Sequence, residues 1–523
     1  EFYANWGLNA IGAQYAYARG FTGAGIKVGI ADSAIQLWHP EFASRVYYPD
    51  PIYSYPVVGY YIEDHGTHVT GIASAGRNGY GMMGVAFDAM ISTVVATSDR
   101  EYGYLMDPQY VQKIAQSGAQ VVNNSYGTSA GEGWTKYYAK PSDGVEAYDA
   151  LDLWSSADMV IVFSAGNQGD KGVPVAQNLP TGVFKFLPLI TPHNTRADGL
   201  YVFVDEGTDL SGDPATFEPF PLNEPLDDSG LTLGTANFSS FAGTFIVVGA
   251  VDRDLELASY SNACGAVKAW CMVAPGTDIF STVPVSTYAI ENGTSMAAPH
   301  VTGAAAVLRQ AFPYMTARQV IEVVLTTATD LGDPGVDEIY GHGLLNLRRA
   351  VQGPIVFGSP LLIDENDPDS QPIFAPIFAV DTKGHDSVWS NEITGDGGFS
   401  KAGAGILTLT GANTYTGDTT ITGGVLRVDG SIATSDLTVT SGATLQGIGT
   451  VGNTMLAGIL SPGNSVGTLT VDGDLSLESG STYFYEIDAD QNGDLVVVTG
   501  TATIDDEAVF ELSAEDGVYL DRL

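Results

Sequence analysis

The stretch Asn292–Ala311, NGTSMAAPHVTGAAAVLRQA, decides the fold of this chain. From Ala297 onward it consists mostly of Ala, Val, Leu and Gly, which is typical of a buried helix that packs tightly against its neighbours. Pro299 is tolerated early in such a helix, because the first N–H groups have no acceptor within the helix. Ser295 therefore lies at or near a helix N-terminus, where the macrodipole favours negative charge. A lone serine there is usually a helix cap, and to be a nucleophile it needs a base and an acid elsewhere in the chain.

The composition of the chain limits the classes of protein to which it can belong. Its 523 residues are enough for about two or three domains with a sizeable core. No apolar run approaches the roughly 18–20 residues of a membrane-spanning helix. Acidic residues outnumber basic ones by 61 to 21, so we expect no nucleic-acid partner and no binding to anionic lipid. This balance suits a secreted protein.

Cys264 and Cys271 are the two cysteines of the chain, in SNACGAVKAWCMVAPG. In an oxidising compartment, two cysteines this close are expected to form a short disulfide loop. In a reducing cytosol they would be two unrelated buried thiols. We favour the disulfide, and the second alternative stays open at this point.

Up to about Gly353, short Val/Ile-rich runs alternate with helical patterns. The expected strands are 27–32, 91–96, 120–124, 158–165, 244–250 and 272–274. The expected helices are 65–75, 108–117, 143–156 and 316–327, with Asp143 and Thr316 as N-caps. Strands that alternate with helices predict βαβ units and a mostly parallel sheet with helices on both faces. Active sites of such sheets lie at the carboxyl ends of the strands.

The composition changes after Gly353. The segment 354–398 is rich in Pro, Asp and Ser and is expected to be a linker, with some strand inside it as an open alternative. From 399 to 523, short Val/Thr/Leu strands recur between Gly, Asn and Asp turns, with almost no helix formers. This pattern predicts a C-terminal parallel β-helix, which is a stack of similar rungs. The pattern is unfinished at Leu523, so we expect the natural chain to continue.

Three segments carry an acid, a base and a nucleophile in this order. VGIADS ends a predicted strand with Asp32, HGTHVTG opens a helix with His65, and GTSMAAPH carries Ser295. Attack on a peptide carbonyl needs a hydroxyl, a base that takes its proton, and a carboxylate that orients the imidazolium. Singly, each residue is more often structural, and His68 is expected to be structural here. Together, on an alternating α/β chain, they indicate a catalytic triad.

These segments resemble the subtilisin-like serine proteases, whose triad is known to occur in this order. HGTHVTG matches the histidine block of the family, GTSMAAPHVTG its serine block, and VGIADSAIQLWHPEF its aspartate block. The resemblance spans most of Trp6 to Gly353 and implies a protease domain over residues 1–353. It also implies hydrolysis of peptide bonds through an acyl-enzyme, with no cofactor for catalysis and no metal in the chemistry.

Two further segments resemble parts of the family's active site. SAGNQG, at 164–169, implies that the side-chain amide of Asn167 stabilises the oxyanion together with the backbone N–H of Ser295. VVNNSYGTSAGEG implies that Ser125, Tyr126 and Gly127 pair with an extended substrate backbone and line its pockets. Taken alone, the hexapeptide would be an ordinary turn at a strand end.

Two regions depart from the family pattern. Glu41 stands where many relatives place a calcium-binding aspartate, and Asn78 lies in a loop that is otherwise unlike a calcium loop. These two would be the candidate ligands of a structural calcium, which we do not assign. An acidic insert at about 170–243 is longer than compact relatives need. It is either a solvated surface subdomain or an acidic rim over the cleft that favours cationic peptides.

The stretch LTLTGANTYTGDTTITGGVL resembles the autotransporter-associated β-strand repeat. A subtilisin-like domain followed by this repeat looks like the passenger region of a bacterial autotransporter protease. The resemblance implies secretion from, or display on, the surface of a Gram-negative bacterium. It also implies an outer-membrane translocator barrel beyond this chain, while the β-helical stalk would carry no chemistry.

The leading hypothesis is an extracellular serine endopeptidase that acts on protein or peptide substrates. Its main rival is a catalytically inactive adhesin or scaffold on a β-helix stalk, which would have little reason to keep all four active-site residues. A serine esterase is disfavoured, because Ser295 lies in GTSMA and not in a Gly-x-Ser-x-Gly elbow. The sequence leaves open the side-chain specificity, the natural substrate and the oligomeric state.

Overall fold

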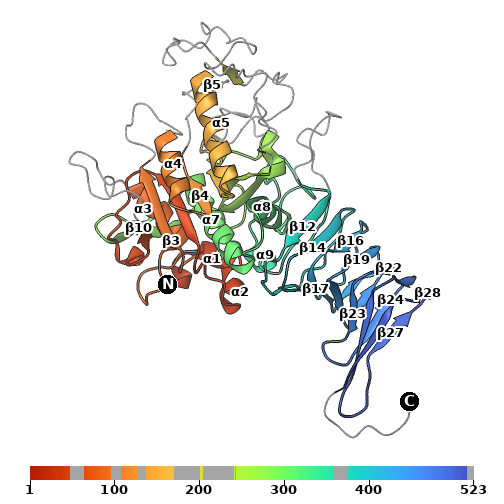
Figure 1. Cartoon of the computed structure of the whole chain (residues 1–523). Coiled ribbons are helices and arrows are strands. Elements are labelled where there is room, and N and C mark those ends of the chain that lie inside the picture. Colours follow the sequence, from red (N-terminus) through yellow and green to blue (C-terminus); the bar gives the residue numbers. More distant parts are fainter. Residues whose placement is uncertain are drawn as a thin grey trace. The chain divides into compact units, whose positions relative to one another are not determined.

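The computed structural model of the chain describes residues 1–47, 64–95, 108–126, 137–139, 141–169, 201–203, 241, 243–358 and 374–514. These residues form two compact units. The first contains Glu1–Ala311 and Thr316–Val351, and the second contains Phe312–Met315 and the described residues from Gln352 onward. In Figure 1 the colours run from red at the start of the first unit to blue at the end of the second.

The first unit is built on a seven-stranded sheet with the order β2-β3-β1-β4-β6-β8-β9, and all neighbouring strands are parallel. Every residue of β4, β6 and β8 is buried, which occurs where both faces of a sheet are covered. The strands are β1 (Lys27–Asp32), β2 (Val46–Tyr47), β3 (Met90–Val95), β4 (Val121–Asn124), β6 (Val160–Ser164), β8 (Phe245–Val251) and β9 (Cys271–Pro275).

Helices cover this sheet. The longest, α7 (Thr294–Ala311), packs against β1, β4, β6, β8 and β9, and it also packs against α3 (Asp64–Ser74). The other helices within the described residues are α1 (Trp6–Ala10), α2 (Ala13–Ala18), α4 (Pro108–Gln116), α5 (Pro141–Ser156), α8 (Ala317–Thr326) and α9 (Leu347–Ala350), with 3-10 turns η1 (Phe2–Ala4), η2 (Pro40–Phe42) and η8 (Gly265–Trp270). No helix among the described residues has the length and apolar character that a bilayer crossing requires.

Two small sheets complete the first unit. β10 (Ile279–Val283) and β11 (Thr287–Glu291) form an antiparallel hairpin directly before α7. β5 (Tyr137–Ala139) and β7 (Tyr201–Phe203) form a parallel pair. The hairpin is tied to α3, because the hydroxyl groups of Ser281 and Thr282 donate to carbonyl oxygens of that helix.

The predicted α/β architecture is confirmed, and each predicted strand is present with its ends shifted by at most two residues. Thr316 is the N-cap of α8, where it forms a capping box with Gln319. The predicted start of the helix at Asp143 is wrong, because α5 begins at Pro141. Proline suits a first helical turn, since its missing N–H would have no acceptor there.

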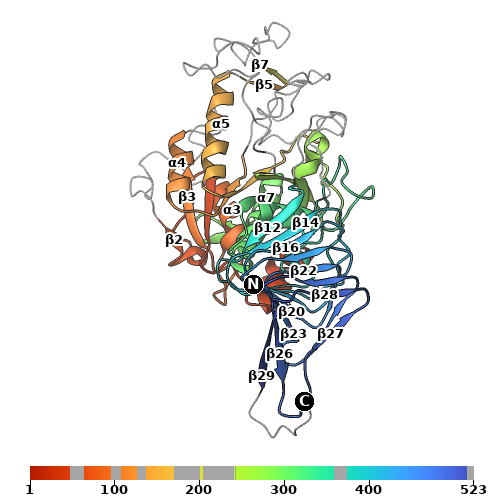
Figure 2. The ribbon, with the colours of Figure 1, turned by 45° about the vertical axis from the view of Figure 1, so that its right-hand side comes forward.

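The second unit is a parallel β-helix, as predicted. Its strands form three stacked sheets in which each strand pairs in parallel with the strand one rung further on. Side chains alternate between interior and surface, as in β20 (Ala443–Gly447), where Ala443 and Leu445 are buried and Thr444 is half-exposed. Figure 2 shows the last rungs, where β26 and β29 lie side by side.

The three sheets of the β-helix have these strands in rung order. The first sheet contains β12 (Ile377–Asp381), β14 (Gly398–Ala402), β16 (Thr419–Ile421), β19 (Leu437–Val439), β22 (Thr454–Leu456), β25 (Leu475–Leu477) and β28 (Ala502–Ile504). The second contains β13 (Ser387–Trp389), β15 (Ile406–Leu409), β17 (Gly424–Val428), β20, β23 (Ile459–Pro462), β26 (Thr482–Ile487) and β29 (Val509–Ala514). The third contains β18 (Ser431–Ile432), β21 (Thr450–Val451), β24 (Thr468–Val471) and β27 (Leu495–Val498).

The β-helix begins earlier than predicted, because β12 and β13 lie inside the expected linker 354–398 and start two of the sheets. The physical reason is an aromatic cluster. Phe378 and Trp389 are buried, and both contact Phe357, whose ring stacks on Phe399 at 5.2 Å. Burial of these rings gives the first rung a core that the Pro- and Asp-rich composition did not indicate.

One predicted segment lies largely, and another partly, outside the described residues. Of the acidic insert at 170–243, the structure describes only β7, Phe241 and Gly243. Of the expected linker, residues 359–373 are not described. The hypothesis of an acidic rim over the cleft therefore stays a prediction.

Lys401 is buried inside the β-helix although it carries a charge. Its Nζ donates hydrogen bonds to the carbonyl oxygens of Gly403 at 2.7 Å, Gly405 at 3.0 Å and Gly423 at 2.7 Å. An ammonium group has three donors, so all of them are satisfied here. These bonds tie the ends of two successive rungs together.

We predict that Lys401→Met loosens the β-helix locally, because three carbonyl groups lose their donor in a buried place. Hydrogen exchange of peptides covering 399–428 should accelerate by about tenfold or more, which corresponds to a local cost of at least about 1.4 kcal/mol. Lys383→Met is the control, because Lys383 is exposed on the same part of the β-helix. Equal exchange rates in both variants would show that the three bonds contribute nothing.

Candidate active site

Three neighbouring strands bring the predicted site residues to one edge of the parallel sheet. Asp32 is the last residue of β1, and Ser125 directly follows β4. Ala31 pairs with Asn124, and Asn124 in turn pairs with Phe163 of β6, whose end leads into the loop with Asn167. The carboxyl ends of parallel strands share an edge, so these groups gather there.

Asp32 and His65 are in direct contact. Asp32 Oδ1 lies 2.7 Å from His65 Nδ1, and the same oxygen accepts the backbone N–H of Ser33 at 2.7 Å. A carboxylate can only accept, so Nδ1 carries the proton and Nε2 presents its lone pair. The Asp32 side chain is 3% exposed and that of His65 is 36% exposed, so the carboxylate is buried behind an accessible imidazole.

The start of α3 is held against β1 at this point. The backbone N–H of Gly66 donates to Ser33 Oγ at 2.9 Å. A Cβ at position 66 would lie 2.5 Å from the carbonyl oxygen of Ser33, so only glycine permits this approach. The glycine after His65 is therefore what allows the imidazole to reach Asp32.

Ser295 is the second residue of α7 and is buried except for a small exposed part. Its Oγ donates to the carbonyl oxygen of Ser125 at 3.0 Å, and Ser125 Oγ donates to the carbonyl oxygen of Ser295 at 2.9 Å. This reciprocal pair fixes the N-terminus of α7 at the end of β4, the strand next to the one that carries Asp32.

Asn167 is exposed, and its side chain is oriented by the residue before Ser295. Its Oδ1 accepts hydrogen bonds from the backbone N–H and from the hydroxyl of Thr294, each at 2.9 Å. The Thr294 hydroxyl in turn accepts the N–H of Gly166, whose φ of 93° requires glycine. With Oδ1 held, Nδ2 is the group that Asn167 has to offer to a ligand.

The substrate-binding residues expected from the sequence are described in part. Ser125 is buried and holds Ser295 as stated above, while Gly127 lies outside the described residues. The Tyr126 hydroxyl donates to Asn124 Oδ1 at 2.9 Å, and burial raises the pKa of that hydroxyl. The role of these three residues in substrate binding stays a prediction.

Two residues beside the candidate site, Thr294 and Glu291, were not predicted from the sequence. Thr294 lies inside the serine motif, and its position next to Ser295 was the available signal. Glu291, four residues before Ser295, is half-buried, and burial raises the pKa of its carboxyl group, while the charge of His65 acts in the opposite direction. It therefore lies within electrostatic range of the imidazole.

Glu41 and Asn78 do not fit a calcium site. The Glu41 oxygens accept hydrogen bonds from the Tyr288 hydroxyl at 2.6 Å, the Met82 N–H at 3.2 Å and Asn78 Nδ2 at 2.9 Å. Asn78 Oδ1 accepts the N–H of Tyr80, which fixes the amide so that its nitrogen faces Glu41. Calcium takes about 6–8 oxygen ligands, whereas these oxygens are committed to protein donors.

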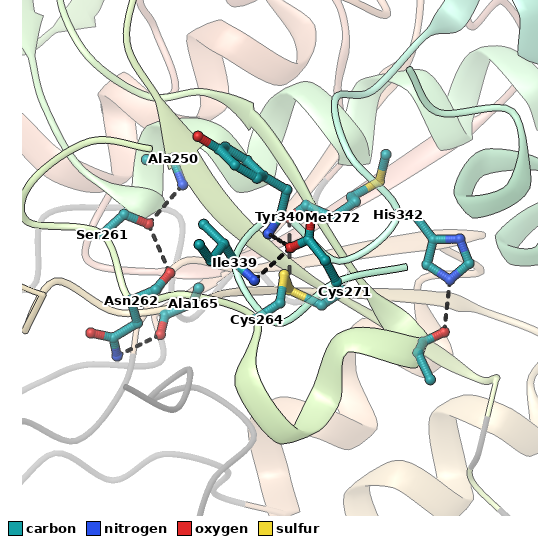
Figure 3. The surroundings of a disulfide bond; sticks show 12 residues. Ala165, Ala250, Ser261, Asn262, Cys264, Cys271, Met272, Ile339, Tyr340 and His342 are labelled. Atoms are coloured by element: carbon teal, nitrogen blue, oxygen red, sulfur yellow. Dashed lines mark hydrogen bonds between the residues drawn. A yellow bond between two sulfur atoms is a disulfide. The ribbon is translucent and has the colours of Figure 1, made fainter. Parts of the chain in front are cut away.

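Cys264 and Cys271 form a disulfide bond with their Cα atoms 5.7 Å apart (Figure 3). The bond closes the short η8 segment before β9. The segment just before Cys264 carries Asn262, whose side-chain amide donates to the carbonyl oxygen of Ala165 (Figure 3).

A parallel sheet with an Asp–His contact at its carboxyl edge and a serine at the N-terminus of the central helix defines the class of a subtilisin-like α/β protein. A model of the subtilase family matches residues 23–343. The chain belongs to this family. Residues 399–428 match the passenger-associated transport repeat.

Three curated relatives illustrate the similarity. An extracellular serine protease of Serratia marcescens is 34% identical over 93% of this chain and 49% of its own length. The autotransporter lipoprotein NalP of Neisseria meningitidis is 28% identical over 78% of this chain and 35% of its own length. Subtilisin DY of Bacillus licheniformis is 30% identical over 66% of this chain and 98% of its own length. The chain thus spans about half the length of the Serratia relative.

Three histidines of the first unit are buried, whereas the side chain of His65 is partly exposed. Burial lowers the pKa of His68, His300 and His342 to about 4. In His300, Nδ1 donates to the Met296 carbonyl oxygen and Nε2 accepts from the side-chain amide of Asn5. A second proton on this ring would lie on Nε2 and would point at the amide donor of Asn5. His65 is therefore the histidine of this region that is placed to exchange protons.

We predict that these three histidines lower the free energy of unfolding as the pH drops from about 6.5 to about 4. In this window the unfolded chain binds protons at the three histidines while the folded chain does not, so protonation favours unfolding. Urea midpoints of the protein over this pH range would measure the decline. His342→Gln should make the decline shallower, and an unchanged slope would contradict this assignment.

Proposed function

We propose that this chain is the protease region of an extracellular serine endopeptidase. The observation that carries the proposal is the 2.7 Å contact between His65 Nδ1 and Asp32 Oδ1 at the sheet edge where Ser295 is held. Ser295 is the nucleophile, His65 is its general base and later the acid, and Asp32 keeps the imidazole in the required tautomer.

The reaction proceeds through an acyl-enzyme. His65 takes the proton of Ser295 Oγ as that oxygen attacks the peptide carbonyl, and it then gives the proton to the leaving amine. Asn167 Nδ2 and the backbone N–H of Ser295 donate to the oxyanion of the tetrahedral intermediate. Water hydrolyses the acyl-enzyme in the same way, so no cofactor takes part in the chemistry. Ser125, Tyr126 and Gly127 pair with the substrate backbone.

The second unit supports a passenger role. A β-helix whose repeat matches a passenger-associated transport repeat, and relatives named as an extracellular protease and an autotransporter, favour secretion or surface display by a Gram-negative bacterium. A translocator domain outside this sequence would serve export. The β-helix then presents the protease and contributes no catalytic group.

We predict that a fluorophosphonate labels the wild-type protein on Ser295 and that Ser295→Ala abolishes both labelling and casein hydrolysis. Asp32→Asn should lower kcat by about 10⁴-fold, because the carboxylate no longer selects the active tautomer; this is the loss known for the same change in a Ser-His-Asp protease. Circular dichroism of both variants would check that they remain folded.

The same experiment separates the rival functions. An inactive adhesin would show neither labelling nor hydrolysis in the wild-type protein. A serine esterase would be labelled and would hydrolyse a short-chain ester while leaving casein intact. Either result would contradict the proposal that the protein is an endopeptidase.

A further inference from the structure

Asn262 is fully buried beside the loop that carries Asn167 and lies outside the set of residues that perform the chemistry. Its backbone N–H donates to the Gly166 carbonyl oxygen at 2.9 Å, and its Oδ1 accepts the backbone N–H of Gln168 at 2.9 Å. Its Nδ2 donates to the Ala165 carbonyl oxygen at 2.9 Å. Asn262 thus binds the backbone on both sides of Asn167.

The loop receives further support from the same segment. Asn262 Nδ2 also contacts Gln168 Oε1 at 3.0 Å, and the N–H of Gly169 donates to the Tyr260 carbonyl oxygen at 2.9 Å. A Cβ at Gly169 would lie 2.4 Å from the carbonyl oxygen of Ser261, so loop and segment are in close contact. Contacts with residues 260–262, which are not part of the loop, therefore fix the backbone path of the loop.

The segment with Asn262 is itself anchored. Ser261 Oγ accepts the N–H of Ala250 in β8 at 2.9 Å, as Figure 3 shows. The Cys264–Cys271 disulfide joins the same segment to the first residue of β9. Asn262 therefore links the loop to two strands of the central sheet.

We infer that Asn262 is a positioning residue for the oxyanion donor: through Ala165, Gly166 and Gln168 it holds the backbone of Asn167, while Thr294 holds the Asn167 side chain. This inference rests on the proposed function, because it assigns Asn262 a role through Asn167. An oxyanion donor acts only when it is fixed before the charge develops, so loosening its backbone lowers transition-state stabilisation and leaves substrate binding largely intact.

The test is a double-mutant cycle on the whole chain with a peptide nitroanilide. Asn167→Ala should lower kcat by about 10²–10³-fold, the loss known for the corresponding donor of subtilisin. Asn262→Ala should lower kcat by about tenfold or more with KM changed less than about twofold. In the Asn167→Ala background, Asn262→Ala should change kcat by less than about twofold, because the donor it positions is already gone.

Asn413→Ala is the matched control. Asn413 is buried in the β-helix, where its Oδ1 accepts the N–H of Ile393 and its Nδ2 donates to the carbonyl oxygens of Gly411 and Ser431. The Asn413→Ala variant loses the same kinds of hydrogen bond as Asn262→Ala. It should lower the thermal midpoint without changing kcat.

A milder variant keeps the inference testable if Asn262→Ala does not fold. In Asn262→Asp the carboxylate still accepts from Gln168 but faces the Ala165 carbonyl oxygen, and only the protonated acid can donate to that oxygen. Its kcat relative to wild type should therefore recover as the pH is lowered. Loss of the same factor in both Asn167 backgrounds, or an effect on KM alone, would overturn the inference. A wild-type protein that cleaves no peptide would instead overturn the proposed function, and this inference with it.

Discussion

The parallel register of β1, β4 and β6 is the constraint on which the candidate site depends. Parallel strands share their carboxyl edge, so Asp32, Ser125 and the loop with Asn167 meet there although each comes from a different part of the chain. Backbone hydrogen bonds of the sheet fix this register. The site therefore inherits its precision from the buried strands and needs only short segments beyond them.

A second constraint couples Ser295, the proposed nucleophile, to Asn167, the proposed oxyanion donor. Thr294 directly precedes Ser295, and its N–H and hydroxyl both bind Asn167 Oδ1. The N-terminus of α7 is in turn held by the reciprocal bonds between Ser295 and Ser125. Because Thr294 connects the helix to the loop after β6, the proposed nucleophile and the proposed donor are held in one hydrogen-bonded unit. This coupling gives Thr294, the first residue of α7, a structural role at this place.

Much of the fold and the candidate site could be predicted from the sequence because the relevant signals are local. Short Val/Ile runs indicate the strands. Each residue of the candidate site lies in a recognisable segment: Asp32, His65, Asn167 and Ser295. Asn262 could not be found in this way, since its partners lie some ninety residues earlier in the chain, in the loop around residues 165–168. A local pattern shows which residue type stands at a position and does not show which distant backbone groups it satisfies.

Glu41 is a second example of a residue whose distant partners cannot be read from a local sequence pattern. Its position suggested a cation, whereas the structure satisfies the carboxylate with the hydroxyl of Tyr288, which lies on the β10–β11 hairpin far along the chain. Burial raises the pKa of the Glu41 carboxyl group, and the hydrogen bonds from Tyr288, Met82 and Asn78 counteract this. A buried carboxylate can be stabilised by a metal or by donors of the protein, and only the three-dimensional partners distinguish the two.

In the β-helix, by contrast, polar groups form hydrogen bonds with residues of the same or the adjoining rung. The hydroxyl of Tyr415 bonds Thr419 Oγ1 at 2.7 Å, this oxygen bonds Ser435 Oγ at 2.7 Å, and Ser435 donates to the carbonyl oxygen of Gly417 at 2.7 Å. In such a stack each rung contacts only its neighbours, so stability is close to a sum of local terms. The first unit instead brings together groups that are distant in the sequence, because they lie at the carboxyl edge of neighbouring parallel strands. In this chain the candidate site therefore lies in the unit whose parallel strands bring sequence-distant residues to one edge, whereas the second unit joins residues of neighbouring rungs.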